Sequence, residues 1–263
     1  LMRREEAYHE KVRGGARDGG GDVANIHDDR VVFKQEGLQD RLAFDRTARK
    51  SLVDHFYTND VSIDQVSRNT FEERGDFATG NFDAKIRRAE DRVQVQLSRL
   101  GRVGQHEIKL TKGVTLHADS STLEIAYVLE NLPQETLHFG VELNFAGMPA
   151  GAEDRYFYRG DQEQLGHLGT QMVLSDIEDL SLVDQWLGLD VQLRANRPTH
   201  FWTFPVETVS NSESGYEAVH QSVVVQPHWF VEPNEQGQWS VVFTMNADTS
   251  LAESRMQPEP AYS

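Results

Sequence analysis

The chain has 263 residues, of which 38% are hydrophobic and none is cysteine, so disulfides and thiolate metal sites are excluded. Its net charge of −16 is uneven: residues 1–150 hold 21 basic and 25 acidic side chains (net −4), and residues 151–263 hold 5 and 17 (net −12). Such a surface repels phosphate backbones and anionic lipid, and no apolar run reaches the roughly 20 residues of a membrane helix, so we expect neither nucleic acid nor a membrane as partner.

The first residues favour a helix that ends in a linker. Residues 2–12 are charged and helix-favouring, and five glycines follow between positions 14 and 21. We therefore expect residues 1–21 to be a helix end and a glycine-rich linker from an upstream domain, and residues 22–263 to form one β-sandwich domain. Residues 31–58 mix charged and apolar side chains without a period of two, which favours a short helix or an irregular crossing segment. Helix is expected mainly within the first 60 residues.

Beyond residue 60 the pattern changes to the alternation typical of half-buried strands. No long amphipathic helix separates these segments, so the strands are expected to pair antiparallel, in two sheets packed face to face. The predicted fold is mainly β, a large antiparallel β-sandwich with a short N-terminal helix and linker, and a loop-rich stretch at 146–170. The alternating segments are 93–97, 108–110, 114–116, 123–129, 139–145, 189–193, 200–206, 222–230 and 239–245.

Four short strings, together with their order and spacing, resemble the C-terminal domain of glycoside hydrolase family 57, the α-amylases and 4-α-glucanotransferases. They are DRTARKSLVDHF at 45–56, EERGDF at 72–77, FGVELN at 139–144 and NSESGYE at 211–217. The resemblance implies a β-sandwich of the galactose-mutarotase-like type, which follows a catalytic barrel that this chain lacks. It also implies an α-glucan-acting parent enzyme, with that barrel as the partner within the same polypeptide. No position matches the family's catalytic motifs, so no catalytic residue is expected here.

The residues alone indicate no cofactor and no metal. The ten histidines are scattered without the close spacing of zinc ligands, and the acidic run at 176–179 lacks the pattern of a calcium loop. Acidic pairs such as Glu213 and Glu217 are explained by a solvated loop. The absence of cysteine and of Asn-X-Ser/Thr acceptors favours a cytoplasmic location. Two other classes stay open, namely a stand-alone carbohydrate-binding sandwich and a small sugar epimerase or lyase.

A carbohydrate site on this sandwich is predicted from one strand. Phe139, Val141, Leu143 and Phe145 share one face, so Glu142 and Asn144 share the other. Carboxylate and amide groups bind sugar hydroxyls, and aromatic rings stack on sugar rings. The candidate binding residues are therefore Glu142, Asn144, Trp202, His228 and Trp229. The alternative is that Glu142 and Asn144 bond to backbone groups or to the linker segment around Asp54 and His55, and serve a domain junction.

Overall fold

The computed structural model describes residues 1–15, 33–160 and 163–256. Its helical elements are α1 (His9–Gly15), η1 (Leu38–Arg41), α2 (Ile63–Ser67) and α3 (Ser250–Met256). Its strands are β1 (Val53–Tyr57), β2 (Asp83–Arg88), β3 (Arg92–Val103), β4 (His106–His117), β5 (Thr122–Glu130), β6 (Leu137–Ala146), β7 (Arg155–Arg159), β8 (Glu163–His167), β9 (Met172–Asp184), β10 (Leu189–Ser212), β11 (Gly215–Val231) and β12 (Trp239–Asp248).

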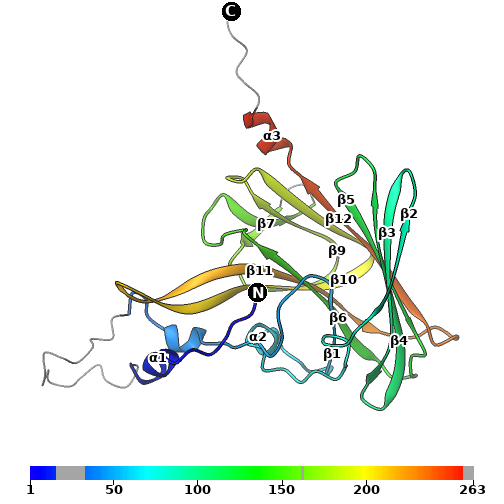
Figure 1. Ribbon diagram of the computed structural model, residues 1–263, viewed down its shortest axis with the longest axis horizontal. Helices are drawn as coiled ribbons and strands as arrows, with labels where there is room; N and C mark the ends of the chain where they lie inside the picture. Colours follow the sequence, from blue (N-terminus) through cyan, green and yellow to red (C-terminus); the bar gives the residue numbers. More distant parts are fainter. Residues whose placement is uncertain (16–32, 161–162, 257–263) are drawn as a thin grey trace, which may run out of the picture.

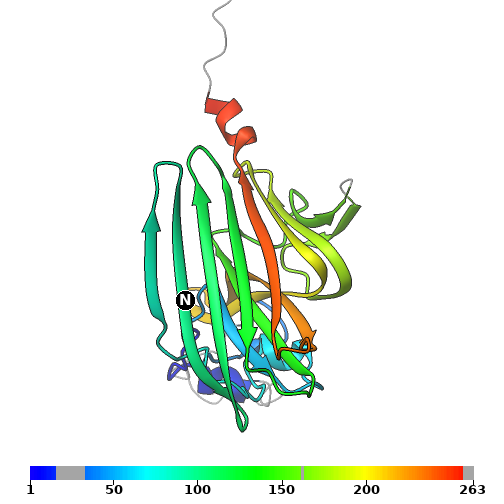
Figure 2. The same cartoon turned by 90° about the vertical axis from the view of Figure 1, so that its right-hand side faces the viewer.

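The described strands form one strongly bent sheet, and every strand pair in it is antiparallel. The order is β1-β6-β11-β10-β12-β5-β4-β3-β2, and β9 joins β10 with β7 and β8 beyond it. The bend folds the sheet into two layers that face each other (Figure 1). Turned by 90°, the cyan and green strands β2 to β5 lie beside the orange-red β12 in one layer (Figure 2). The predicted antiparallel sandwich is therefore confirmed, but one sheet builds both layers.

The large core lies between the two layers and follows from the predicted alternation. Phe139, Val141 and Leu143 of β6 are all buried in it. The ring centroid of Phe139 lies 5.1 Å from that of Phe56 on β1 and 5.6 Å from that of Tyr127 on β5, in the opposite layer. Because burial of each large aromatic side chain contributes roughly 1.5–3 kcal/mol, these contacts hold the layers together.

The outer face of the layer β1-β6-β11-β10 is also covered. Tyr57, Trp202 and Phe204 belong to a second buried cluster there, against which Ile63 of α2 packs. Helix α2 begins with a capping box, in which Ser62 accepts from the backbone N–H of Gln65 and the Gln65 side chain accepts from that of Ser62. Polar side chains on this outer face are therefore enclosed between the sheet and the segment that crosses it.

The N-terminal helix is shorter than predicted. It begins only at His9, because residues before it pair with the crossing segment instead. The backbone N–H of Asp45 donates to the Arg3 carbonyl at 2.9 Å, and that of Arg49 donates to the Leu1 carbonyl at 2.7 Å. The glycine-rich stretch at 16–21, predicted as a linker, lies outside the described residues.

Several elements differ from the prediction in extent. Strand β1 lies within the segment predicted to be helical or irregular, and β7 and β8 lie in the stretch predicted to be loop-rich. The segments at 108–110 and 114–116 are one strand, β4, and those at 189–193 and 200–206 are one strand, β10. Helices α2 and α3 lie beyond residue 60. None of the helices in the described ranges is long and apolar enough to cross a bilayer.

Candidate functional site

Four of the five predicted sugar-binding residues share the covered outer face of the sheet. Gly140 of β6 pairs with His228 of β11, and Glu142 and Asn144 follow on the same face by alternation. The Trp202 ring centroid lies 3.9 Å from that of His228. Glu142, Trp202 and His228 are each at most 5% exposed. A sugar would reach them only after displacement of the segment that covers the sheet.

The fifth residue, Trp229, lies on the opposite face and belongs to the large core. It pairs with Phe139 across the two strands, and its indole N–H donates to Thr199 Oγ1 at 3.0 Å. Its ring centroid lies 5.4 Å from that of Trp239 on β12. Trp229 therefore packs between the layers.

Glu142 is the centre of a buried ionic network. Its Oε2 accepts a hydrogen bond from Arg49 Nη1 at 3.0 Å, and its Oε1 accepts one from Asn144 Nδ2 at 2.6 Å. Asn144 Nδ2 also donates to the Lys50 carbonyl at 3.0 Å. His55 Nε2 lies 3.7 Å from Glu142 Oε2, a distance at which charge attraction acts without a direct hydrogen bond. These contacts join Glu142 and Asn144 to the crossing segment, as in the alternative in which the two residues serve a domain junction.

Asp45 extends the network to the N-terminal segment. Its Oδ1 accepts from Arg3 Nη2 at 2.7 Å and from Arg49 Nε at 2.9 Å, while its Oδ2 accepts from Arg3 Nε at 3.1 Å and from the Arg3 backbone N–H at 2.8 Å. Arg3 Nη2 also donates to the carbonyl of Ser67, the last residue of α2, at 2.9 Å. Charge-assisted and bidentate bonds of this kind are the strongest that side chains form. Arg3 is thereby fixed to both the crossing segment and α2.

The electrostatics of the network hold its carboxylates ionised. Burial alone would raise the pKa of Asp45, but the hydrogen bonds and charges of Arg3 and Arg49 outweigh it and lower that pKa. Burial would likewise raise the pKa of Glu142, which His55, Arg49 and Asn144 lower instead. Glycosidic cleavage needs a carboxylic acid that is protonated near neutral pH. Neither Asp45 nor Glu142 meets this requirement.

His55 carries a positive charge within the same network. Its Nδ1–H donates to Glu73 Oε2 at 2.6 Å, and Glu73 Oε1 accepts from the Phe56 backbone N–H at 2.8 Å. Burial would lower the pKa of His55, but Glu142 and Glu73 on its two sides raise it to about 9. The imidazole is therefore an imidazolium bound between two carboxylates near neutral pH.

The raised pKa of His55 predicts that the protein loses stability in alkaline solution. A histidine whose pKa is higher in the folded state stabilises the fold fully below its unfolded pKa of about 6.5, and this stabilisation is lost as the pH rises through about 9. The contribution is on the order of 3 kcal/mol. Urea unfolding at pH 6.5 and 9.5 should show a larger loss for the natural protein than for His55→Gln. A His55 ring that titrates near pH 6.5 by NMR would contradict this assignment.

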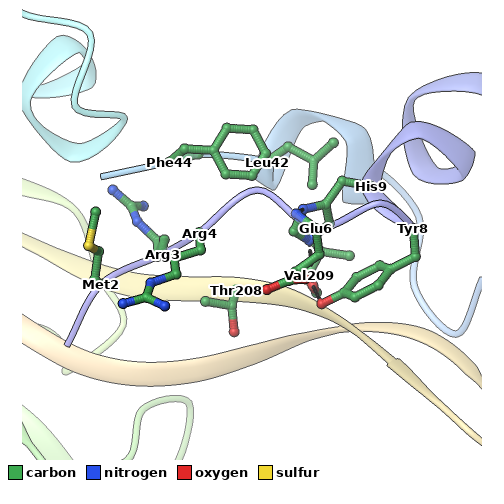
Figure 3. Close-up of a pocket in the computed structure, with 11 residues that line it drawn as sticks. Met2, Arg3, Arg4, Glu6, Tyr8, His9, Leu42, Phe44, Thr208 and Val209 are labelled. Carbon is green, nitrogen blue, oxygen red and sulfur yellow. Dashed lines mark hydrogen bonds between the residues drawn. The ribbon is translucent and has the colours of Figure 1, made fainter. Parts of the chain in front are cut away.

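The N-terminal segment lies across the β10–β11 hairpin and encloses a cavity of about 210 Å³ with it (Figure 3). Tyr8 Oη donates to the Val209 carbonyl at 3.2 Å, and His9 Nε2–H donates to the same carbonyl at 3.0 Å. His9 Nδ1 accepts from the Glu6 backbone N–H at 2.9 Å, which fixes the turn before α1. The N-terminal segment is thus held at two places, by the ionic network and by the hairpin.

A cluster of neutral histidines lies beside the network on the same face. His138 Nδ1–H donates to the Thr58 carbonyl at 3.3 Å, so its Nε2 accepts from His228 Nδ1 at 2.8 Å. Burial lowers the pKa of His138 to about 4 and that of His228 to about 2. Gly140 leaves room for this cluster, since a Cβ there would lie 2.9 Å from the Tyr57 ring. Both imidazoles are therefore uncharged at neutral pH.

Three comparisons relate the chain to known proteins. A family model described as alpha-amylase/4-alpha-glucanotransferase, C-terminal, matches residues 1–243. The chain is 27% identical over 229 residues to Alpha-amylase 1 of Dictyoglomus thermophilum, covering 84% of this chain and 31% of that protein. It is 28% identical over 224 residues to the 4-alpha-glucanotransferase of Thermococcus kodakarensis, covering 85% of this chain and 30% of that protein. The chain therefore spans less than a third of the length of these relatives.

Among solved structures, the fold is similar to the crystal structure of the 4-alpha-glucanotransferase from Thermococcus litoralis. The TM-score is 0.68 at 20% sequence identity, and the match covers 94% of this chain and 31% of that chain. At this identity the likeness shows the fold.

Proposed function

Since the chain belongs to the family of C-terminal domains of α-amylases and 4-α-glucanotransferases, we propose that it is a non-catalytic β-sandwich that supports the catalytic barrel of an α-glucan-acting enzyme. The observation that carries the proposal is the burial of Arg3, Asp45, Arg49 and Glu142 in one ionic network. This network fixes the N-terminal segment, through which the domain would connect to the barrel. The proposal includes a cytoplasmic location.

The chemistry of the network supports a positioning role. Both Asp45 and Glu142 are held ionised by arginine, so neither supplies the proton that a glycosidic leaving group requires. A network of four buried ionic side chains gives little more stability than apolar side chains of the same size would give. It does fix the relative placement of the segments that it joins. Such a network suits a domain whose first residues have to be held in one orientation.

Carbohydrate binding is the second candidate function. The residues proposed for it are Glu142, Asn144, Trp202 and His228. Their mutual alignment on one sheet face favours it. The burial of Glu142, Trp202 and His228 favours the first candidate instead, because a binding site has to be reached by its ligand.

The proposal predicts that the purified chain shows no hydrolysis or transfer on starch or maltoheptaose above background. Added to a separately produced catalytic part of the same enzyme, it should raise the temperature at which that part loses activity. Reducing-sugar release and product chromatography measure the first arm, and residual activity after heating measures the second.

Serum albumin at equal mass serves as the control for nonspecific protection in the heating experiment. Release of reducing sugar by the chain alone, abolished by a carboxylate substitution within it, would overturn the proposal. A catalytic part whose heat inactivation is unchanged by the chain would do so as well.

A further inference from the structure

A second hollow lies far from the ionic network, between the outer face of β7, β9, β10 and β12 and helix α3. It has a volume of about 250 Å³. Both views place α3 at the end of the molecule opposite to α1 (Figures 1 and 2). We refer to this hollow as the tyrosine pocket. Its lining residues include Tyr156, Tyr158, Gln185, Asp190, Asp248 and Leu251.

Two tyrosines form one wall of the tyrosine pocket. Tyr156 and Tyr158 alternate on β7 and therefore point to the same face, with ring centroids 6.3 Å apart. Tyr156 is partly exposed to solvent. The flat apolar face of such a ring stacks on the C–H face of a sugar ring.

Polar groups with free hydrogen-bonding capacity line the same space. Tyr158 Oη donates to Asp190 Oδ2 at 2.6 Å, while the buried Oδ1 of Asp190 has no partner among the described residues. Gln185 Nε2 donates to Tyr156 Oη at 3.2 Å, which leaves the proton of that hydroxyl available to a ligand. One free acceptor and one free donor suit vicinal hydroxyl groups, each of which both donates and accepts.

The charge of the tyrosine pocket narrows the class of ligand. Asp190 and Asp248 line it, and the half of the chain that contains it carries a net charge of −12. Such a site repels phosphorylated or sulfated sugars and carboxylates. In the described ranges no three His, Cys, Asp or Glu side chains are grouped to hold a metal ion. A neutral polyhydroxylated ligand fits both observations.

The walls of the tyrosine pocket are held in place by α3. Arg255 Nη1 and Nη2 donate to the carbonyls of Trp186 and Gln185 at 2.7 and 2.8 Å, which ties the helix to the turn. Gly188 in this turn has φ +72°, and a Cβ there would lie 2.5 Å from the Ala252 backbone nitrogen. Only glycine permits this close approach, so the turn and the helix form one preorganised wall.

We propose that the tyrosine pocket binds one or two residues of a neutral oligosaccharide, by stacking on Tyr156 and by hydrogen bonds to Asp190 and the Tyr156 hydroxyl. The assignment of that oligosaccharide as an α-glucan rests on the proposed function. A volume of about 250 Å³ is just below the roughly 300–1,000 Å³ of pockets that enclose drug-sized ligands, which suits a single ring with its neighbours in solvent. The site would hold a long substrate on the enzyme without taking part in its cleavage.

Titration calorimetry of the full 263-residue chain with maltoheptaose tests this inference. We expect millimolar binding, weakened about tenfold by Tyr156→Ala, because it removes the stacking surface. Trp186→Ala should leave binding unchanged, because the Trp186 ring lies against Arg155. Phe230→Ala is the matched control, since it deletes an aromatic ring that is 46% exposed on β11, away from the pocket. Melting curves of all three variants within a few degrees of the natural protein establish that the fold is kept.

Two results would overturn the inference. One is the absence of binding heat at 10 mM maltoheptaose. The other is binding that Phe230→Ala or Trp202→Phe weakens while Tyr156→Ala leaves it unchanged, which would place the sugar on the covered face. Neither result contradicts the proposed function, because protection of the catalytic part from heat does not depend on sugar binding in the tyrosine pocket.

Discussion

Glu142→Ala is expected to lower the free energy of unfolding by about 3–5 kcal/mol, since it removes one partner from a buried ionic network. The guanidinium of Arg49 would lose its 3.0 Å bond to Glu142 and the imidazolium of His55 would lose one of its two carboxylates. Arg49 and His55 are nearly inaccessible to water, so solvent cannot replace the missing charge. Urea unfolding at pH 7, followed by circular dichroism, measures the change.

Glu130→Ala is the matched control for this prediction. Glu130 also lies in a strand and pairs with Lys109 at 2.7 Å, but the pair is exposed and should contribute less than about 1 kcal/mol. Glu142→Gln should fall between the two, because the amide keeps the packing and loses the charge. A Glu142→Ala protein of unchanged stability that binds maltoheptaose less tightly would instead assign Glu142 to sugar contact.

Lys112→Met is expected to lower the free energy of unfolding as much as Glu142→Ala does, by about 3–5 kcal/mol. Lys112 Nζ donates to Asp54 Oδ2 and to the Leu52 carbonyl, both at 2.6 Å, and the Asp54 side chain is fully buried. Burial already raises the pKa of Asp54 despite the attraction of Lys112. Without the ammonium the carboxylate has to be protonated or left unpaired in the core, and both cost stability at pH 7.

Two companion variants make the Lys112 prediction specific. Lys109→Met changes the same residue type in the same strand at an exposed position and should be nearly neutral. The double variant Lys112→Met with Asp54→Leu should recover most of the loss, because a buried ion pair can be replaced by apolar groups of similar size at little cost. A double variant as unstable as the single one would show that packing, not charge, accounts for the loss. Thermal unfolding by calorimetry compares the four proteins.

The alternation in the sequence was sufficient to predict which residues of β6 face the core. It failed for β1, where the inward Asp54 and the outward His55 are both buried in ion pairs. A strand that buries charge on both faces shows no hydrophobic period, so a method based on hydrophobicity reads it as irregular. A buried ion pair also accounts for the shorter N-terminal helix. Arg3 is bound to Asp45, so the residues before His9 lie along the crossing segment instead of forming a helix.

The candidate site itself could not be derived from local sequence. Its ion pairs join residues far apart in the chain, since Arg3 and Asp45 are separated by 42 positions and Arg49 and Glu142 by 93. Charged residues at such separations are indistinguishable from solvated surface residues until the register of the strands is known. The available signal was the resemblance, whose strings at 45–56, 72–77 and 139–144 supply Asp45, Glu73 and Glu142 to one network.

The position of β12 in the sheet has a consequence for biosynthesis. Among the described strands it comes last in the chain, yet it lies between β10 and β5, and its pairings join the two layers. Until Trp239–Asp248 has left the ribosome, β5 and β10 each lack one neighbour. A nascent chain in which β10 has already emerged therefore carries two open sheet edges, and the sandwich closes only once β12 is available, with the slow kinetics of long-range strand pairing.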